Sequence, residues 1–492
     1  MLIDISRREK KDMMIGVIDY EKAFDFTNRF LLCHDLMDKK FGKRFVQNFM
    51  NSYESTRYVV KASSTERGPS IDTDQGLTQG KTTSSNYFSL FVSDMPNGLQ
   101  EAHNQDFMDP FNIFQLADDT TVIAEVIRSF IRNMTIVSKY SLEKFLRIHL
   151  TKSQYLHLTS DITKKLSEDI ILENMTLKPI IDAYNWLGFW LSDTNDVAQI
   201  IEYHFKKKLV HISSFYSWLA INQDTPFAIK MLVLYNCLFA TLLYSCEVWI
   251  NLPNLSEQLL GIERKALKSC LGVKQSTTDD IIYLELNKAD IVSTILDRQL
   301  NFYTKLMKHD QNSAIVIGVW NLYNNIIGNE VGFLHYFQSL EPKNKCINKT
   351  NRVERIQLSD RSMSARYKEL CSLKYCETLY NSFVIERYRT VITRWRLSSH
   401  SLRIETGRYT RPKTPRSERN CSICNTVEDE HHALFVCNAH IFIREHYKDI
   451  ISKYPTVQAI LNPVTTNDAN TIGKYILDIE RNMDELKMIG KV

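Results

Sequence analysis

The alternation of apolar and polar positions near the start of the chain predicts a strand, a turn and a helix. Residues 13–19, MMIGVID, form an apolar run that ends in an acid, which is typical of a buried strand. From Asp25 the spacing of apolar residues becomes helical and continues to Gly42, where a helix would end. We therefore expect Asp19 to stand at the carboxyl end of a buried strand.

A polar loop, a helix and a hairpin are predicted next. Residues 72–85, DTDQGLTQGKTTSS, are polar and lead into the apolar run NYFSLFVSDM. Between residues 111 and 124, two apolar runs are separated only by Asp118 and Asp119, which is the spacing of a hairpin with an acidic pair at its tip. An amphipathic helix is expected to about residue 146, and strands are expected near residues 153–158 and 185–191.

Helical patterns dominate after about residue 200 and continue to about residue 395. Residues 231–250 are nearly long enough to span a membrane, but they include four polar residues and lack flanking anchors. A buried helix is therefore favoured over a membrane helix. We place domain boundaries near residues 197, 310 and 410.

Composition indicates an ordinary globular protein. The 492 residues are 44% hydrophobic and 24% charged, which suits two or three domains and argues against large-scale disorder. The charged opening segment does not resemble a secretory signal. We expect an intracellular, reducing location, so the ten cysteines are interpreted as core thiols or metal ligands rather than disulfides.

Positive charge is concentrated in residues 387–419, which hold ten Lys or Arg against two Glu, although the whole chain is only +4. Tyr388, Trp395 and Tyr409 lie among these cations. Such a segment suits RNA or DNA through phosphate neutralisation and stacking, and a solvated helix face is the alternative. The residues expected to bind nucleic acid are Arg387, Arg389, Arg394, Arg396, Arg403, Arg408, Arg411 and Lys413.

The aspartates at the predicted strand end and hairpin tip suit metal-dependent phosphoryl transfer. Two divalent cations about 4 Å apart activate a hydroxyl and stabilise a leaving group in such reactions, and Mg²⁺ prefers carboxylate oxygens. Asp19, Asp118 and Asp119 would supply these oxygens if the strand end faces the tip. Ordinary turn chemistry and a solvated strand end are the alternatives.

Five segments resemble, in order, the reverse transcriptase motifs of non-LTR retrotransposons. They are Asp19–Asp25 (DYEKAFD, motif A), Gly76–Gly80 (GLTQG, motif B), Leu116–Asp119 (LADD, motif C), Lys152 (motif D) and Trp186–Gly188 (WLG, motif E). The resemblance implies an α+β fold with a right-hand palm made of an antiparallel sheet and packed helices. It further implies a palm at residues 1–197, a helical thumb at 198–310, a helical connector with the basic segment at 311–410, and a Cys/His tail at 411–492.

The same resemblance implies roles for individual residues. Asp19, Asp118 and Asp119 would bind two Mg²⁺ ions, and Lys152 would donate a proton to pyrophosphate, with an exposed helix-end lysine as the alternative. The residues expected to contact the dNTP are Tyr20, Phe24, Gln79 and Gly80. Tyr20 would do so through its backbone. Phe24 would act as a steric gate, and a core residue is the alternative interpretation of it. Trp186, Leu187 and Gly188 would form the primer grip.

The chain departs from the family pattern at several positions. Ser85 stands where motif B usually has proline, Leu116 replaces an aromatic residue in motif C, and His149 replaces an asparagine in motif D. Only eighteen residues precede Asp19, so we expect the fingers and any endonuclease to lie outside this chain.

The remainder resembles the thumb and tail of these elements. Residues 228–230 and 243–249 resemble the thumb, where Tyr244 and Trp249 are interpreted as core. In the tail, Cys421, Cys424, His432 and Cys437 have the spacing of a structural Zn²⁺ site. His431 and the more distant His440 are alternative ligands. The alternative interpretation of the cluster is a set of reduced cysteines that binds no metal.

Two functions follow from these observations. In the first, the chain is an RNA-directed DNA polymerase for target-primed reverse transcription, with an RNA template, a DNA primer or target and dNTPs as partners. It would act in the nucleus or cytoplasm as a ribonucleoprotein. In the second, it is a truncated, inactive relic that binds RNA or DNA through its basic Cys/His tail. The oligomeric state stays open.

Overall fold

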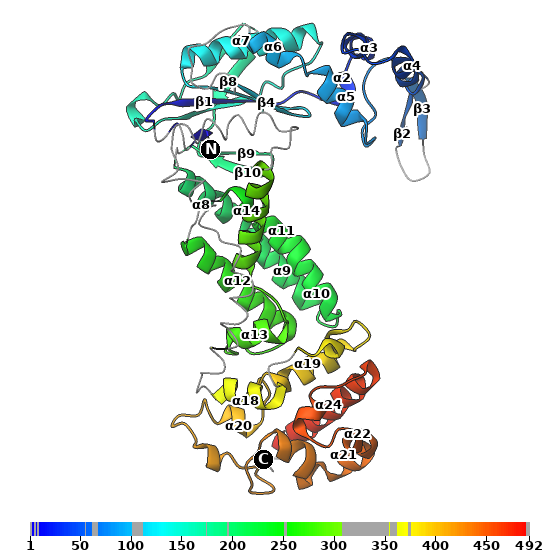
Figure 1. Cartoon of the computed structure of the whole chain (residues 1–492), viewed down its shortest axis with the longest axis vertical. Coiled ribbons are helices and arrows are strands. Elements are labelled where there is room, and N and C mark those ends of the chain that lie inside the picture. Colours follow the sequence, from blue (N-terminus) through cyan, green and yellow to red (C-terminus); the bar gives the residue numbers. More distant parts are fainter. Residues whose placement is uncertain are drawn as a thin grey trace. The chain divides into compact units, whose positions relative to one another are not determined.

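The computed structural model describes residues 2–3, 6, 9–54, 56–61, 67–100, 112–173, 175–193, 196–249, 253–307, 354, 362–371 and 375–488 (Figure 1). These residues form two compact units, the first ending at His204 and the second beginning at Phe205. The four domains expected from the sequence stay a prediction, and most of the expected connector before residue 362 lies outside the described residues.

A six-stranded sheet forms the centre of the first unit, in the order β4-β5-β1-β6-β8-β7. Its central strand β1 is buried along its whole length and pairs antiparallel with β5 on one edge and β6 on the other. The strands are β1 (Met13–Ile18), β4 (Ile113–Leu116), β5 (Asp119–Ala124), β6 (Gln154–Leu158), β7 (Ile170–Leu172) and β8 (Met175–Pro179). The mixed α and β character expected from the sequence is confirmed.

The sheet is mixed rather than purely antiparallel, so the expectation of an antiparallel palm sheet was wrong for one pair. Strand β8 runs parallel to β6, with Gln154 opposite Lys178 and Tyr155 opposite Pro179. The chain first passes through the 3₁₀ turn η1 (Ile162–Lys164) and the edge strand β7, which together reverse its direction before β8. Short, isolated strands such as β7 carry too few residues for a periodic signal.

The acidic hairpin is shifted by one residue from the expected register. Leu116 pairs with Asp119, so Ala117 and Asp118 form the two-residue turn and Asp119 is the first residue of β5. Ala117 has a φ of 54°, a left-handed conformation that two-residue hairpin turns require and that alanine rarely adopts. The tip therefore presents one aspartate, and the strand presents the other.

Residues 183–192 form a hairpin instead of the single strand expected near 185–191. Strand β9 (Ala183–Trp186) pairs with β10 (Phe189–Ser192). The turn between them contains Leu187 and Gly188, with φ values of 50° and 82°. Two successive positive φ values match the twist of a tight hairpin, but only the glycine signals it in the sequence.

Helices cover the sheet and continue beyond its edge. Helix α7 packs on β1 and β5, and α6 lies beside it on the same face (Figure 1). A methyl group on Gly16 of β1 would lie 2.8 Å from the Phe130 ring, so this glycine lets α7 approach the sheet. These helices are α2 (Ala23–Phe26), α3 (Arg29–Asp38), α4 (Lys43–Asn51), α5 (Ser84–Phe91), α6 (Met95–Gln100) and α7 (Ile127–Glu143).

The region between α2 and α5 differs from expectation in its boundaries. The expected helix from Asp25 to Gly42 is divided, because the Asn28 side chain accepts from the Phe30 and Leu31 N–H groups and starts a new helix, α3. Gly42 ends this helical region as expected and also precedes α4. A two-stranded ribbon of β2 (Arg57–Lys61) and β3 (Arg67–Asp72) follows.

Only helices, and no ladder strands, are found among the described residues of the second unit. Helix α8 (Val197–Lys208) leads into it. The helices before residue 308 are α9 (Val210–Ile221), α10 (Phe227–Val233), the π-helix η2 (Leu234–Phe239), α11 (Ala240–Leu242), η3 (Cys246–Val248), α12 (Pro253–Leu271), α13 (Asp279–Glu285) and α14 (Ile291–Met307). The later ones are α18 (Ser362–Cys371), η5 (Glu377–Tyr380), α19 (Glu386–Arg396), α20 (Arg403–Thr406), η6 (Arg416–Glu418), η7 (His432–Val436), η8 (Asn438–His440), α21 (Ile441–His446), α22 (Lys448–Lys453), α23 (Val457–Ile460) and α24 (Thr466–Met488).

The apolar residues 231–248 form a helical stretch that packs in this unit, made of the end of α10, η2, α11 and, after a turn, η3, and Ile250 lies outside the described residues. Leu234, Leu238, Phe239 and Leu242 are buried, whereas Leu232 is 52% exposed. Trp249 is core as expected, but Tyr244 is 44% exposed. None of the helices that the structure describes is long and apolar enough to cross a membrane.

Buried ion pairs join the two helical parts of the second unit. Lys230 of α10 lies 2.7 Å from Glu386 of α19, and both side chains are buried. Arg396 of α19 lies 2.7 Å from Glu285 of α13, again with both side chains buried. Tyr367 also donates to Glu285. Since an unpaired buried charge is costly, each pair requires its partner helix.

We predict that Arg396→Met strongly destabilises the second unit. The substitution leaves Glu285 buried without its cation, which costs about 3–5 kcal/mol of unfolding free energy. Urea unfolding monitored by tryptophan fluorescence measures this loss. The matched control is Arg411→Met, an exposed residue of the same basic segment, for which we expect a change within about 0.5 kcal/mol. Equal effects of the two substitutions would contradict the prediction.

Candidate active site and metal centre

The register of β1 and β5 brings the three aspartates together. Ile18 pairs with Thr120, so the next residues of this antiparallel pair, Asp19 and Asp119, stand side by side at the end of the ladder. Asp118 precedes Asp119 in the hairpin turn. Acids about 100 residues apart in the sequence therefore meet at one edge of the sheet.

Asp19 is held in place through its backbone. Its N–H donates to the Ser153 hydroxyl at 3.2 Å, and its carbonyl accepts from the His149 N–H at 2.8 Å. The Asp19 carboxylate is partly exposed to solvent and lies 3.4 Å from the Lys152 ammonium. Lys152, the expected proton donor, is thus adjacent to the acids and 63% exposed at its side chain.

The electrostatics of the cluster favour a bound cation. Burial raises the pKa of Asp119, and the charges of Asp118 and Asp19 raise it further. Burial, followed by the charges of Asp119 and Asp19, likewise raises the pKa of Tyr184 in β9. Tyr184 therefore lies close to the acids, although no sequence motif marks it. A hard divalent cation would offset the repulsion, and carboxylates are its preferred donors.

A cleft of about 590 Å³ opens beside these acids. Asp19, Asp118, Phe24, Gln79 and Lys152 line it, together with the segment around Tyr20. The Tyr20 side chain itself is buried, and its hydroxyl is 3.3 Å from that of Ser141, so only its backbone is available to a ligand. Gly80 is exposed and is not among the lining residues.

The loop that carries Gln79 is fixed against motif A. Leu77 donates its N–H to the Phe24 carbonyl at 2.7 Å, and the Gln79 amide donates to Asp25 at 3.2 Å. Gly76 has a φ of 88°, and a methyl group there would lie 2.7 Å from the Asp25 carbonyl oxygen. This position consequently requires glycine. Phe24, the expected steric gate, is half-buried and packs on Phe88 with ring centroids 5.3 Å apart.

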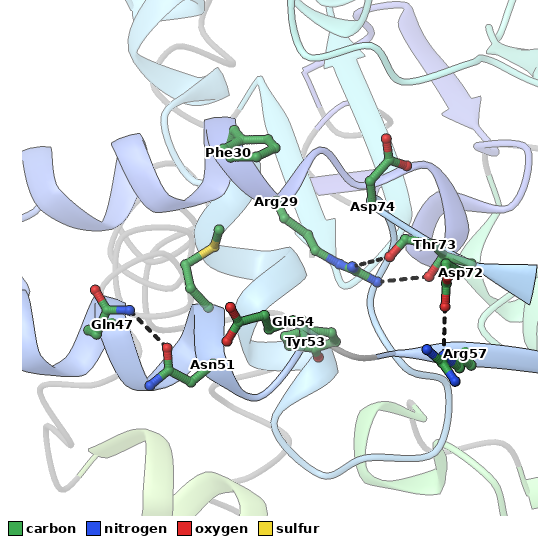
Figure 2. A pocket seen from close by; sticks show the side chains of 11 residues that line it. Arg29, Phe30, Gln47, Asn51, Tyr53, Glu54, Arg57, Asp72, Thr73 and Asp74 are labelled. Carbon is green, nitrogen blue, oxygen red and sulfur yellow. Dashed lines mark hydrogen bonds and ion pairs between the residues drawn. The ribbon is translucent and has the colours of Figure 1, made fainter.

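A buried arginine supports this loop from a second cavity of about 780 Å³. Figure 2 shows Arg29 reaching from α3 toward Thr73, and its guanidinium donates to the Thr73 carbonyl at 2.8 Å and to the Gly76 carbonyl at 2.7 Å. Its guanidinium also stacks over the Tyr53 ring at 4.8 Å. Sequence patterns missed Arg29, because a basic residue in the first turn of a helix usually faces solvent.

The residues expected to form the primer grip occupy the tip of the β9–β10 hairpin. Trp186 ends β9, and Leu187 and Gly188 form the turn. None of the three lines the 590 Å³ cleft. Tyr184, two residues before Trp186, is nevertheless close to the acids, so the hairpin lies near the cleft.

Comparison with known proteins assigns the first unit. Residues 2–191 match the family model described as reverse transcriptase (RNA-dependent DNA polymerase). The first unit carries a reverse transcriptase domain. The match covers every motif from Asp19 to Gly188 and ends at the last residues of β10.

Two further comparisons add little to this assignment. Among solved structures, the chain is similar to a telomerase chain from Candida albicans in complex with a TWJ fragment of telomeric RNA. The identity is 11%, the TM-score is 0.23, and the match covers 63% of this chain. The chain spans about half (50%) of the length of the telomerase chain. No curated protein matches the chain. The reverse transcriptase assignment rests on the family model and on the geometry of the aspartates.

Outside the reverse transcriptase domain, the structure brings together the four expected zinc ligands. The ligand atoms of Cys421, Cys424, His432 and Cys437 all lie within 4.8 Å of one another. The Cys437 sulfur is 3.8 Å from each of the other two, close to the roughly 3.8 Å separation of thiolates bound tetrahedrally at Zn–S distances of 2.3 Å. Asn425, with a φ of 53°, makes the tight turn after the first cysteine pair.

The donors fit a structural zinc ion. The Nε2 atom of His432 is buried without a hydrogen-bond partner, whereas Nδ1 lies 3.1 Å from the Thr426 hydroxyl, the arrangement of a ligating imidazole held by an outer partner. Burial raises the pKa of Cys437 to about 12, so its thiolate requires a nearby cation. His431 and His440 are not part of the cluster, and His440 instead contacts Asn482.

The expectation that the whole basic segment binds nucleic acid was wrong for three of its arginines. Arg389 and Arg396 are 1% and 0% exposed and pair with Glu386 and Glu285. Arg408 is largely buried and pairs with Glu405. Arg389 and Arg396 belong to α19, which packs along α24 (Figure 1). Like Arg408, they are enclosed within the fold and are not available to phosphates. Tyr388 and Trp395 are buried as well, so they cannot stack on bases.

The other expected cations remain at the surface. Arg387, Arg394, Arg411 and Lys413 are exposed, and Arg403 is half-buried. Arg394 donates to the Gly272 carbonyl at 2.7 Å, which fixes its position beside the C-terminal end of α12. Within α19, the helical period of 3.6 residues explains the division, because Arg387 and Arg394 lie on one side of the helix and Arg389 and Arg396 on the opposite, buried side.

We predict that Asp119→Asn stabilises the reverse transcriptase domain at neutral pH in the absence of divalent cations. A carboxyl whose pKa is raised in the folded state disfavours folding once it ionises, so this penalty appears as the pH rises above the ordinary value of 3.8. The melting temperature of the variant should exceed that of the parent chain at neutral pH, and the difference should shrink toward about pH 4. Asp74→Asn, which changes an exposed acid outside the cleft, serves as the control. A pH-independent difference would contradict the prediction.

Proposed function

We propose that the chain is the RNA-directed DNA polymerase of a non-LTR retrotransposon, which extends a DNA primer on an RNA template with dNTPs. The observation that carries the proposal is the meeting of Asp19, Asp118 and Asp119 at one edge of the sheet, inside a domain that matches the reverse transcriptase family. The motif form at Asp19–Asp25 and the Cys/His spacing of the tail support the non-LTR type.

The residues of the cleft support a two-metal mechanism. Asp19 and Asp118 would hold Mg²⁺, with Asp119 as a supporting acid. When bound, the cations lower the pKa of the primer hydroxyl and neutralise the charge that develops on the phosphates. Phe24 walls the cleft where a ribose 2′-hydroxyl would clash, and Gln79 faces it from the motif B loop. Lys152, beside Asp19, is placed to donate a proton to the leaving pyrophosphate.

The tail would act as a nucleic-acid-binding module of the same protein. The zinc ion at Cys421, Cys424, His432 and Cys437 would stabilise the fold around the exposed cations Arg411 and Lys413. The RNA template and the DNA target are the proposed ligands, and an intracellular ribonucleoprotein in nucleus or cytoplasm is the proposed setting for target-primed synthesis.

We predict that the purified chain extends oligo(dT) on poly(rA) with Mg²⁺ or Mn²⁺. Asp118→Asn should lower the rate at least roughly 10³-fold, because a lost metal ligand removes several kcal/mol of transition-state stabilisation. Incorporation of labelled dTTP measures the rate. Asp38→Asn, a 67% exposed side chain outside the cleft, should leave the rate unchanged.

The alternative function makes a different prediction in the same assay. A relic that only binds nucleic acid would retard labelled RNA in a gel-shift experiment and incorporate no dTTP with either cation. That outcome, with the parent chain folded, would replace the polymerase proposal. Incorporation that survives Asp118→Asn would show that the activity arises elsewhere.

We also predict that the tail binds a single zinc ion. Combined Cys421→Ser and Cys424→Ser substitutions remove two of four ligands, so elemental analysis of the dialysed protein should find zinc in the parent chain and almost none in the variant. Cys237→Ser, which changes an exposed cysteine outside the cluster, should retain the metal. Equal zinc contents in the parent chain and the double variant would contradict the assignment.

A further inference from the structure

The active-site cleft collects more negative charge than its cations offset. Asp19, Glu21 and Asp118 all line it, and Asp119 stands next to Asp19. A nucleoside triphosphate would add its own phosphate charges to this site. Binding such a substrate therefore requires positive side chains at the cleft, in addition to divalent cations.

Three cationic residues line the cleft, and they are not equivalent. Lys152 already lies 3.4 Å from the Asp19 carboxylate, and Lys22 is exposed at a backbone position with a φ of 45°. Arg147 is the third. Among the described residues no carboxylate pairs with it, so its charge is not neutralised within the fold.

The backbone of Arg147 is fixed beside the turn that follows Asp19. Its carbonyl accepts from the Glu21 N–H at 2.8 Å. Ile148 forms a bridge with Tyr20, and the His149 N–H donates to the Asp19 carbonyl at 2.8 Å. Residues 147–149 thus pair through their backbone with residues 19–21, and this pairing fixes the position of Arg147 relative to the catalytic acids.

The Arg147 side chain is also oriented. Its guanidinium carbon lies 4.6 Å from the centre of the Phe26 ring, a contact that keeps the planar group against the aromatic face. Stacking uses the face of a guanidinium and leaves the N–H groups at its edge available for hydrogen bonds. Planar N–H pairs match the geometry of phosphate oxygens better than a lysine ammonium does.

We propose that Arg147 binds the terminal phosphates of the incoming nucleoside triphosphate. The proposal rests on the polymerase function proposed above and adds a residue from the segment after α7 that no motif comparison assigned. Phe26 acts as the platform that orients Arg147. The side chain would make bidentate contacts with phosphate oxygens, and its role would be in substrate affinity rather than in the chemical step.

A binding measurement tests this role independently of turnover. The full chain is loaded with a template–primer that ends in a dideoxynucleotide, and a non-hydrolysable dTTP analogue is titrated with Mg²⁺. Arg147→Ala should weaken the Kd about tenfold to a hundredfold, because a hydrogen bond to a charged group is lost. Arg147→Lys should give an intermediate Kd. Arg128→Ala, an exposed arginine of α7 outside the cleft, should bind like the parent chain.

Primer extension supplies the second readout. Arg147→Ala should raise the KM for dTTP by a similar factor and change kcat far less, whereas a merely structural defect would lower the active fraction and leave KM unchanged. An unchanged Kd in Arg147→Ala would overturn the assignment of Arg147. If the parent chain binds the analogue in an Arg147-dependent way but extends no primer, the polymerase proposal fails and the Arg147 site stands. Absence of analogue binding by the parent chain would overturn both.

Discussion

The pairing of β1 on both of its edges is the constraint on which the first unit depends. Because β1 is buried throughout and hydrogen-bonded to β5 and β6, a shift by one residue would turn its apolar side chains to the wrong face. The same register fixes the loop after β1 against the turn after α7 and against the acidic hairpin. Catalytic geometry and core packing are thus set by one ladder, and Gly16 is the point where α7 rests on it.

The two candidate metal sites use opposite strategies toward charge. In the reverse transcriptase domain, carboxylates repel one another at a solvent-accessible edge, which suits exchangeable cations and a charged substrate. In the tail, three thiols and an imidazole are gathered in a mostly buried cluster, which suits an ion that stays bound. Elsewhere in the second unit, the buried arginines of α19 are paired with carboxylates of the protein itself.

Local features could be predicted from the sequence because they depend on neighbouring residues. The strand ending at Asp19, the helix after the motif B loop and the zinc-ligand spacing all follow from short patterns.

The structure differs from expectation where residues distant in the sequence determine the burial of a side chain or the pairing of a strand. Arg389 and Arg396 read as a basic surface, yet their partners Glu386 and Glu285 lie on buried faces that a charge count does not reveal. The hairpin register shifted because Ala117 accepts a positive φ, which only pairing with β5 imposes. The parallel strand β8 was missed because its position is determined by β6 rather than by its own sequence.

The ion pair between Lys230 and Glu386 bears on the order in which the protein folds. Glu386 follows Lys230 by 156 residues, which a ribosome needs roughly 8–30 s to add. During that interval the Lys230 ammonium lacks Glu386, the carboxylate with which it pairs in the folded core. The face of α10 that carries Lys230 therefore remains hydrated. The helices before residue 308 therefore complete their packing only when α19 has left the exit tunnel. Folding of the second unit is in this sense a late event, because its first helices depend on a residue that is synthesised much later.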